Sequence, residues 1–321
     1  MTISKLAELH NSKVISENIS IKDGTKLTDT HIEGKEVIVE SDVALRGCKI
    51  FSTGKIFIGK NSIIKENTII NAFKSVSIGD RTIIDRDVFV GGMQSEKSEL
   101  EIGNDSVILF RSYLNTTRKI SIGKNVGIGG YCLIFTHSAW LNVLEGNPYS
   151  FASVEIKDNV WIPWNVTIFP DVTIREDVII GGGSVVTKSL PSGVFAAGVP
   201  AKIIRVNDKS SKILSTDKKN AIILEILSDF HSYVSEFLKI VNNKSSDHHN
   251  FVITFDTTRL VYTLDFEGIT KTDTIISFLI PLQIKRAYEW IELDTLTSKT
   301  KNDLAVYFID FIKRYGIKIK K

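Results

Sequence analysis

The strongest constraint in this sequence is an aliphatic residue that returns at every sixth position. In one uninterrupted stretch the repeated residues are Ile156, Ile162, Ile168, Ile174, Ile180 and Val186. Four places after each of the first five stands a valine or a serine. An ordinary strand repeats every two residues and a helix about every 3.6, so a period of six fits a short strand plus a corner. Three such faces, each pointing one large side chain inward, would close one coil of about eighteen residues.

The same rule holds earlier in the chain, where the spacing between coils is less regular. The residues that start successive coils are Ile58, Ile78, Ile102, Ile122, Ile156 and Ile174, which lie 20, 24, 20, 34 and 18 positions apart. Extra residues must therefore leave the stack at corners, and the longest step contains an insertion at residues 138–153. Corners need residues that tolerate a positive φ, and we expect this conformation at Asn61, Asn67, Asn104, Asn125, Asn159 and Asn165. A β-sandwich of many short strands is the alternative, and the N-terminal part that contains His10 and His31 is expected to be irregular.

The composition changes near residue 205. Of 21 glycines, only Gly268 and Gly316 lie beyond it, and apolar residues there return every three or four places, as on a helix with one buried face. Segments rich in β-branched and aromatic residues follow, and then a second helical pattern. We therefore predict two domains, with repeat coils in residues 1–205 and a small α+β module in residues 206–321.

Charge and hydropathy exclude several classes of protein. With 40 basic and 37 acidic residues, the chain gives no electrostatic reason to bind nucleic acid. No apolar stretch reaches the 18 or so residues of a membrane span, and the N-terminus does not read as a signal peptide. Two cysteines, Cys48 and Cys132, cannot build a disulfide framework and are typical of a reducing compartment. A cytoplasmic protein is the expectation.

Three motifs near the end of the repeat carry a resemblance to a known family. They are VWI at residues 160–162, GGGSVVTK at residues 181–188 and AGVPAKIIR at residues 197–205. Together with the hexapeptide repeat, they resemble the closing coils of hexapeptide-repeat acyltransferases, in particular the sugar O-acetyltransferases and xenobiotic acetyltransferases. The resemblance covers about residues 20–205 and implies a left-handed parallel β-helix, an exception to right-handed crossovers.

The resemblance also implies a cofactor and an assembly. Acetyl-CoA would lie as the acyl donor in a groove between neighbouring β-helices of a homotrimer. Residues matching family positions that hold it are Trp161, Trp164, Gly182, Thr187, Lys188, Lys202 and Arg205. The positive charges of Lys202 and Arg205 suit the phosphate groups of this cofactor, because a cationic donor beside a phosphate makes a strong charge-assisted contact. The sequence departs from the family at Pro163, where a glycine is usual, and at the bulky Trp164.

The transfer of an acetyl group to a hydroxyl needs a general base, and histidine titrates near neutrality. His137 alone among the six histidines lies at a corner of the repeat, directly before the long insertion, and the family's catalytic histidine sits on this coil. One coil earlier, Thr117 and Asn115 stand close enough in register to orient the imidazole or the acceptor; a plain corner asparagine is the alternative for Asn115. Three histidines converging from adjacent coils, which a zinc site would need, are absent, so we expect no metal.

The insertion carries Trp140 and Tyr149 among small polar residues, and loops of this length on a rigid scaffold are usually functional. Their rings could stack on a sugar or simply pack the loop. The sequence thus predicts an acetyl-CoA-dependent O-acetyltransferase that acts on a sugar hydroxyl, such as that of a bacterial surface polysaccharide. Two alternatives stay open: N-acetylation of a nucleotide-linked amino sugar, and a β-helix scaffold without catalysis.

Overall fold

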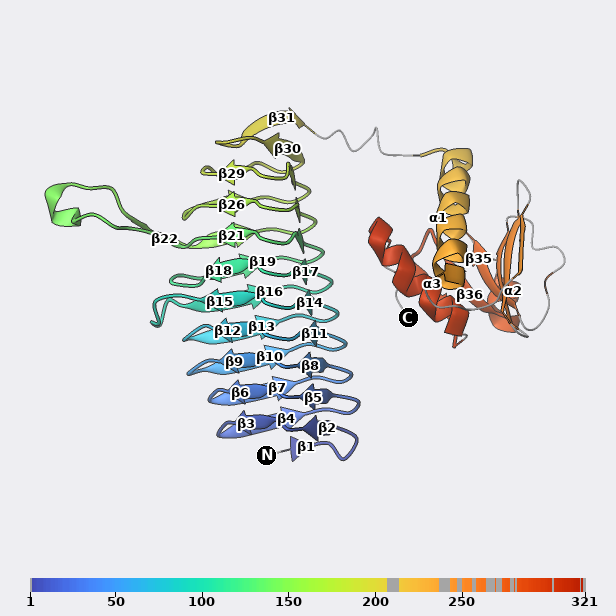
Figure 1. Cartoon of the computed structure of the whole chain (residues 1–321), viewed down its shortest axis with the longest axis horizontal. Coiled ribbons are helices and arrows are strands. Elements are labelled where there is room, and N and C mark those ends of the chain that lie inside the picture. Colours follow the sequence, from blue (N-terminus) through green and yellow to red (C-terminus); the bar gives the residue numbers. More distant parts are fainter. Residues whose placement is uncertain are drawn as a thin grey trace. The chain divides into compact units, whose positions relative to one another are not determined.

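The computed structural model describes residues 2–206, 214–236, 243–246, 250–255, 258–263, 269, 273–277, 280, 282–301, 303–317 and 319. The chain divides into two compact units, Met1–Lys209 and Ser210–Lys321. Each unit is considered separately below. The first consists of stacked coils, and the second of helices packed on a sheet (Figure 1).

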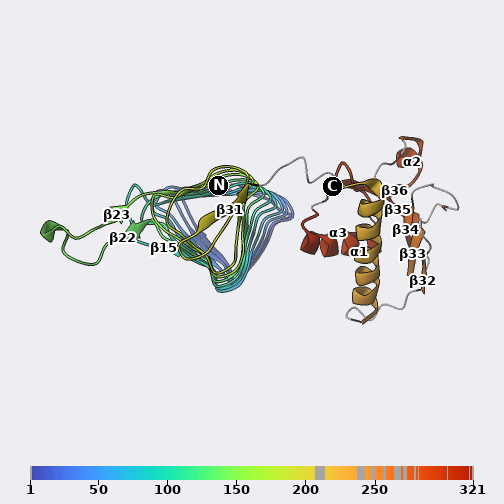
Figure 2. The same ribbon diagram turned by 90° about the horizontal axis from the view of Figure 1, so that it is seen from above.

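The first unit is a left-handed parallel β-helix, as the family resemblance implies. Each coil contributes one strand to each of three parallel sheets, named here A, B and C in the order in which the chain visits them. Seen from above, the coils superimpose as a triangle (Figure 2). The coil starts pair in register, so that Ile58 lies beside Ile78 and Ile122 beside Ile156. The irregular spacing in the sequence is thus absorbed at corners, and the core stays continuous.

Sheet A contains nine strands: β1 (Thr2–Ile3), β4 (Asn18–Ile21), β7 (Glu36–Val39), β10 (Lys55–Ile58), β13 (Ser75–Ile78), β16 (Glu99–Ile102), β19 (Ile120–Ile122), β24 (Val154–Ile156) and β27 (Thr173–Ile174). Sheet B contains eleven: β2 (Glu8–His10), β5 (Lys26–Thr28), β8 (Ala44–Arg46), β11 (Ile63–Ile64), β14 (Ile83–Ile84), β17 (Val107–Ile108), β20 (Gly127–Ile128), β25 (Trp161–Ile162), β28 (Ile179–Ile180), β30 (Val194–Ala197) and β31 (Lys202–Val206). Sheet C contains nine: β3 (Lys13–Ile15), β6 (His31–Glu33), β9 (Lys49–Phe51), β12 (Ile69–Asn71), β15 (Phe89–Gly91), β18 (Tyr113–Asn115), β21 (Leu133–Ile134), β26 (Thr167–Ile168) and β29 (Val185–Val186). Regular coils therefore begin at Thr2, and the expectation of irregular structure around His10 and His31 was wrong, because these residues lie in β2 and β6.

The interior explains the repeat. Each sixth residue, such as Ile64, Ile70 or Ile84, is fully buried in one continuous aliphatic column, and burying a side chain of this size contributes about 1.5–3 kcal/mol. The small residue four places later points inward beside a corner. There Ser62 donates to the Gly79 carbonyl at 2.7 Å, one coil away. Such hydroxyls satisfy buried backbone acceptors that a larger apolar side chain would leave unpaired.

Corner residues adopt the left-handed conformation at Asn61, Asn67, Asn125, Asn159 and Asn165, as predicted. The prediction was wrong at Asn104. There the next residue, Asp105, takes the positive φ of 61°. The Asn104 side chain instead accepts the Asp80 backbone N–H at 2.9 Å and ties two coils together.

An arm leaves sheet C where the sequence has its longest insertion. It is formed by β22 (His137–Ser138) and β23 (Ser150–Phe151), paired antiparallel, with a short 3-10 turn at η1 (Val143–Glu145) between them. The arm projects away from the triangular stack in both views (Figures 1 and 2). At the last coil, β31 turns back antiparallel on β30 and ends the β-helix.

The second unit is an α+β module, as predicted. Its sheet contains β32 (Asn243–Ser246), β33 (Asn250–Phe255), β34 (Thr258–Thr263), β35 (Asp273–Ser277), β36 (Glu289–Glu292) and β37 (Thr297–Lys299). Its helices are α1 (Thr216–Glu236), α2 (Leu282–Ala287), α3 (Asp303–Ile312) and the 3-10 helix η3 (Lys313–Tyr315). Phe230 from α1 and Phe308 from α3 meet edge to face, 5.2 Å between ring centroids, in its core. Among the described residues, no helix has both the length and the apolar character needed to cross a membrane.

Candidate functional site

His137 stands where the arm leaves the stack of coils. The chain exits β21, passes Phe135 and the buried Thr136, and enters β22 with His137 as its first residue. The antiparallel pairing sets His137 opposite Phe151 of β23, and their ring centroids lie 5.8 Å apart. The imidazole is therefore held at the junction of a rigid coil and a projecting arm.

Asn115 is the side chain that contacts the imidazole. It ends β18, one coil before His137, and is 3 % exposed. Its Oδ1 lies 3.0 Å from His137 Nδ1. The Thr136 hydroxyl donates to the Asn115 backbone carbonyl at 2.5 Å, which couples the two coils at this position. The stacking register thus brings together two residues that are 22 positions apart in the sequence.

The orientation of the Asn115 amide is fixed by a backbone donor. The Thr117 N–H, which can only donate, points at Asn115 Oδ1 at 3.2 Å, and the amide nitrogen donates to the Tyr113 hydroxyl at 2.8 Å. Since Oδ1 is an acceptor, His137 Nδ1 must carry the hydrogen in the neutral ring. The lone pair is therefore on Nε2, which has no hydrogen-bond partner among the residues that the structure describes.

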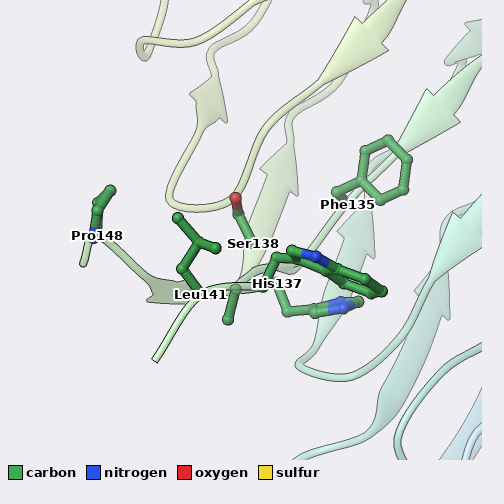
Figure 3. Close-up of a pocket in the computed structure, with 7 residues that line it drawn as sticks. Phe135, His137, Ser138, Leu141 and Pro148 are labelled. Atoms are coloured by element: carbon green, nitrogen blue, oxygen red, sulfur yellow. The ribbon is translucent and has the colours of Figure 1, made fainter. Parts of the chain in front are cut away.

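A hollow of ≈ 400 Å³ lies beside the imidazole. It is lined by Phe135, His137, Ser138, Ala139, Trp140, Leu141 and Pro148. Figure 3 shows Leu141 and Pro148 of the arm on one side of His137 and Phe135 on the other. Trp140 is 96 % exposed and Tyr149 63 % exposed, so neither ring packs the arm against its own coils. Both predicted aromatic residues are therefore available to a ligand.

Three of the residues expected to bind the donor lie at the two edges of sheet C. Thr187 and Lys188 follow β29 at the same edge as His137. They lie two coils further on, because Phe135 N–H bonds to Ile168 and Phe169 N–H to Val186. At a coil spacing of about 4.8 Å this is roughly 10 Å. Gly182 lies at the opposite edge, where sheet B turns into sheet C, and it is exposed.

Lys202 and Arg205 lie in β31, and both are exposed. Neither has a carboxylate partner among the described residues, although the Arg205 guanidinium sits 5.2 Å from the centre of the Phe195 ring. Trp161 in β25 turns its side chain outward from sheet B and is 57 % exposed. These residues are chemically suited to an elongated, phosphate-bearing ligand, because they supply cations and an exposed aromatic face.

The Trp164 side chain points away from Gly182, which lies at the same corner one coil later. A Cβ on Gly130 would come within 2.7 Å of Trp164 Cζ3, so the indole lies over the backbone one coil earlier. The nearest Trp164 atom to a Cβ on Gly182 would be its backbone oxygen, at 3.5 Å. The ring meets Phe110 edge to face at 5.1 Å and lies 6.1 Å from Tyr131. Sequence reasoning missed Phe110 and Tyr131; aligning the corners coil by coil would have found them.

Cys132 is packed into the small inward position of its corner. Its thiol is buried and contacts the Pro163 carbonyl oxygen at 3.0 Å. Burial raises the pKa of the Cys132 thiol, which disfavours the nucleophilic thiolate. This geometry supports a structural role for the cysteine nearest to His137.

Comparisons with known proteins find similarity to several acetyltransferases. The chain is 33 % identical over 164 residues to galactoside O-acetyltransferase of Escherichia coli, covering 50 % of this chain and 75 % of that enzyme. It is 33 % identical over 107 residues to 2,3,4,5-tetrahydropyridine-2,6-dicarboxylate N-acetyltransferase of Staphylococcus aureus, covering 33 % of this chain and 40 % of that enzyme. A hexapeptide-repeat acetyltransferase of Vibrio cholerae, solved with acetyl-coenzyme A, is 21 % identical, covers 48 % of this chain and 72 % of its own, and has a TM-score of 0.32. No family model matches the sequence.

Proposed function

Because this chain belongs to the hexapeptide-repeat acyltransferase family, we propose that it transfers an acetyl group from acetyl-CoA to a hydroxyl group of a sugar. The observation that carries the proposal is the contact of 3.0 Å between His137 Nδ1 and Asn115 Oδ1. It leaves the Nε2 lone pair of a neutral imidazole beside an open hollow, as a general base requires. The similarity to a galactoside O-acetyltransferase favours a sugar hydroxyl as the acceptor.

In this mechanism His137 Nε2 accepts the proton of the acceptor hydroxyl as its oxygen attacks the thioester carbonyl. Asn115 accepts the Nδ1 hydrogen throughout and so holds the ring in the tautomer that can act as base. As the tetrahedral intermediate collapses, the C–S bond breaks and the imidazolium returns its proton to the departing thiolate. Proton count and charge balance without any other titrating group, which suits the uncharged Asn115 side chain at Nδ1.

The donor would bind along the closing coils. Gly182 and Gly183 form an open corner where a Cβ on Gly183 would meet no atom within 4 Å, so an extended thioester arm can lie close to the backbone there. Thr187, Lys188, Lys202 and Arg205 offer a hydroxyl and three cations toward its phosphates, and Trp161 an exposed ring. The two edges of sheet C are separated within one chain, and a homotrimer would bring the glycine edge of one protomer to the His137 edge of the next.

The acceptor side of the site is proposed to include the arm. Trp140 and Tyr149 expose faces that can stack on a pyranose ring, and a bacterial surface polysaccharide is an acceptor large enough to use both. A cytoplasmic location of the protein is supported by two buried, unpaired cysteines, which are typical of a reducing compartment.

N-acetylation is the second candidate function, and one observation favours it. The chain is 33 % identical both to the galactoside enzyme and to a tetrahydropyridine-dicarboxylate N-acetyltransferase, although the second match is shorter, with 107 residues against 164. An amine acceptor, such as a nucleotide-linked amino sugar, would need the same base, because a protonated amine must lose a proton before its nitrogen can attack the thioester. The two candidates differ in product, because an ester is cleaved by mild alkali and an amide survives.

The experiment that tests the proposal is mass spectrometry of sugars and surface glycans after incubation with the protein and acetyl-CoA. We expect a mass increase of one acetyl group that mild alkali removes. His137→Gln should lower the rate by about 10²-fold or more without loss of acetyl-CoA binding, measured by titration calorimetry. Alkali-stable product would favour N-acetylation, and full activity in His137→Gln would contradict the mechanism.

A further inference from the structure

A column of cationic and aromatic side chains lies along the corner where sheet B turns into sheet C. It consists of Arg86, Phe110, Arg111, Tyr131 and Trp164, which come from four successive coils; we call it the B/C column. We propose that the B/C column is an acceptor subsite for a sugar residue that carries an anionic group, a carboxylate or a phosphate. The inference rests on the proposed function, and it gives that acceptor a chemical class.

Backbone hydrogen bonds establish that the column is continuous. Arg111 N–H bonds to the Arg86 carbonyl, Tyr131 N–H to Phe110 and Asn165 N–H to Gly130, so the corners stack directly on one another. Gly130 leaves a gap in the stack, and the Trp164 indole fills it and reaches the Phe110 ring at 5.1 Å. The Arg86 guanidinium lies 5.7 Å from the centre of that ring on the next coil. Together these contacts make one surface of partly exposed rings with a cation at its end.

Two members of the column sit in a costly backbone conformation. Within residues 2–206, the left-handed corner positions are glycine, asparagine or aspartate except at Arg81, Arg111 and Tyr131, with φ of 53°, 56° and 57°. A bulky residue there is strained, because its Cβ crowds the backbone. At Arg81 the strain is offset by a bidentate ion pair with Asp105, with nitrogen-to-oxygen distances of 2.7 and 2.8 Å.

Arg111 and Tyr131 make weaker contacts that offset less of the strain. The Arg111 guanidinium contacts the Tyr131 hydroxyl at 3.1 Å and approaches Asp87 at 3.9 Å, and its side chain is 60 % exposed. Exposed contacts of this kind add little stability. Strained residues that the fold does not need are found at functional sites, and here the strain places a guanidinium and a phenol ring side by side on the surface.

The chemistry of the column selects the ligand. Within the described part of the chain, Arg86 has no carboxylate in ion-pair range, and Arg111 has Asp87 only at the limit of that range. Two guanidinium groups without a firm carboxylate partner favour an anion, which their planar forks can bind bidentately. The half-exposed faces of Tyr131 and Trp164 favour a ligand that places a flat or apolar ring face beside the anionic group. A sugar that carries an anionic group satisfies both demands at once.

Direct binding to the full-length protein tests the subsite, with intrinsic tryptophan fluorescence as the readout. The probes are a galacturonic acid trisaccharide, its neutral galactose counterpart and UDP-glucose. We expect one of the two anionic probes to bind at least about tenfold more tightly than the neutral trisaccharide, the difference of one charge-assisted contact. The probe that binds identifies carboxylate or phosphate as the source of the anion. Equal affinity for all three would overturn the proposal.

Arg86→Gln with Arg111→Gln should remove that preference while leaving the affinity for acetyl-CoA within about twofold. Arg81→Gln is the matched control, because it removes a corner arginine of the same strained class from a different edge, and it should leave the preference intact. Loss of acetyl-CoA affinity in the double variant would instead assign the column to the donor. Arg111→Asn relieves the backbone strain and removes the guanidinium at the same time. We therefore expect a higher melting temperature together with weaker anion binding. Unchanged anion binding would overturn the assignment.

The outcomes are distinguishable from failure of the proposed function. If anionic probes bind through the two arginines but no acetyl transfer occurs, the subsite stands and the transferase proposal fails. If transfer occurs equally well to neutral and acidic acceptors and the double variant leaves both KM values unchanged, the transferase proposal stands and the subsite is refuted.

Discussion

Replacement of Asn115 by aspartate isolates the role of the residue that orients the imidazole. Asn115→Asp has the same shape, and its contacts can survive: the Thr117 N–H still donates to an oxygen, and the Tyr113 hydroxyl turns from acceptor to donor. The new carboxylate would lie 3.0 Å from His137 Nδ1. The change therefore adds one negative charge beside the proposed base and little else.

The magnitude follows from that geometry. Two unit charges about 4 Å apart at an effective dielectric constant near 20 attract by about 4 kcal/mol. His137 is half-buried, so solvent screening weakens this attraction. We expect the new carboxylate to stabilise the imidazolium over the neutral ring by about 1.4–2.7 kcal/mol. The acidic limb of the profile of kcat/KM against pH should then move to higher pH by about 1–2 units. At alkaline pH, where the base is free in both proteins, activity should stay within a few-fold of wild type.

The assay is acetyl transfer followed by thiol release from acetyl-CoA over a range of pH. Asn115→Ala is the control, because it removes the acceptor of the Nδ1 hydrogen without adding a charge. It should lower the alkaline plateau by about tenfold, the cost of one lost hydrogen bond, and leave the limb in place. An acidic limb that does not move in a folded Asn115→Asp protein would refute the argument that Asn115 acts through His137.

Four further results are expected. Lys202→Ala with Arg205→Ala should raise the KM for acetyl-CoA more than it lowers kcat, since phosphate contacts stabilise ground and transition states alike; an unchanged KM would remove both from the donor site. Burial raises the pKa of Cys48 to about 11, so iodoacetamide under mildly alkaline conditions should label it only after unfolding in urea, as peptide mass spectrometry would report. Ile70→Ala, at a fully buried position, should lower the free energy of unfolding by about 2–5 kcal/mol in denaturant titrations. A chain of residues 1–209, the first compact unit, should still bind acetyl-CoA in calorimetry, and a folded fragment that fails to bind would place part of the donor site in the second unit.

Most of the fold was predictable, because its information is local. A buried isoleucine at every sixth position specifies an inward-facing strand, and its small partner specifies the corner, so the spacing alone aligns Ile58, Ile78 and Ile102. The sequence predicted the left-handed residue of a corner less well where two adjacent residues both tolerate a positive φ. At Asn104 and Asp105, two residues suited to a positive φ are adjacent, and hydrogen bonding to the neighbouring coil decides which one adopts it.

The sequence by itself determined that His137 is a corner histidine beside a long insertion, and that the motifs proposed to bind the donor belong to the closing coils. It could not choose between Thr117 and Asn115 as its partner, because both stand within two residues of the same register. The tertiary structure decided this: the Thr117 hydroxyl accepts the Met93 N–H at 3.1 Å from the coil before, and the Asn115 side chain turns to the imidazole. The B/C column likewise joins Arg86 to Trp164 through Phe110, although the three residues are far apart in the sequence. Such contacts depend on side-chain direction between stacked coils, which a periodic sequence pattern does not encode.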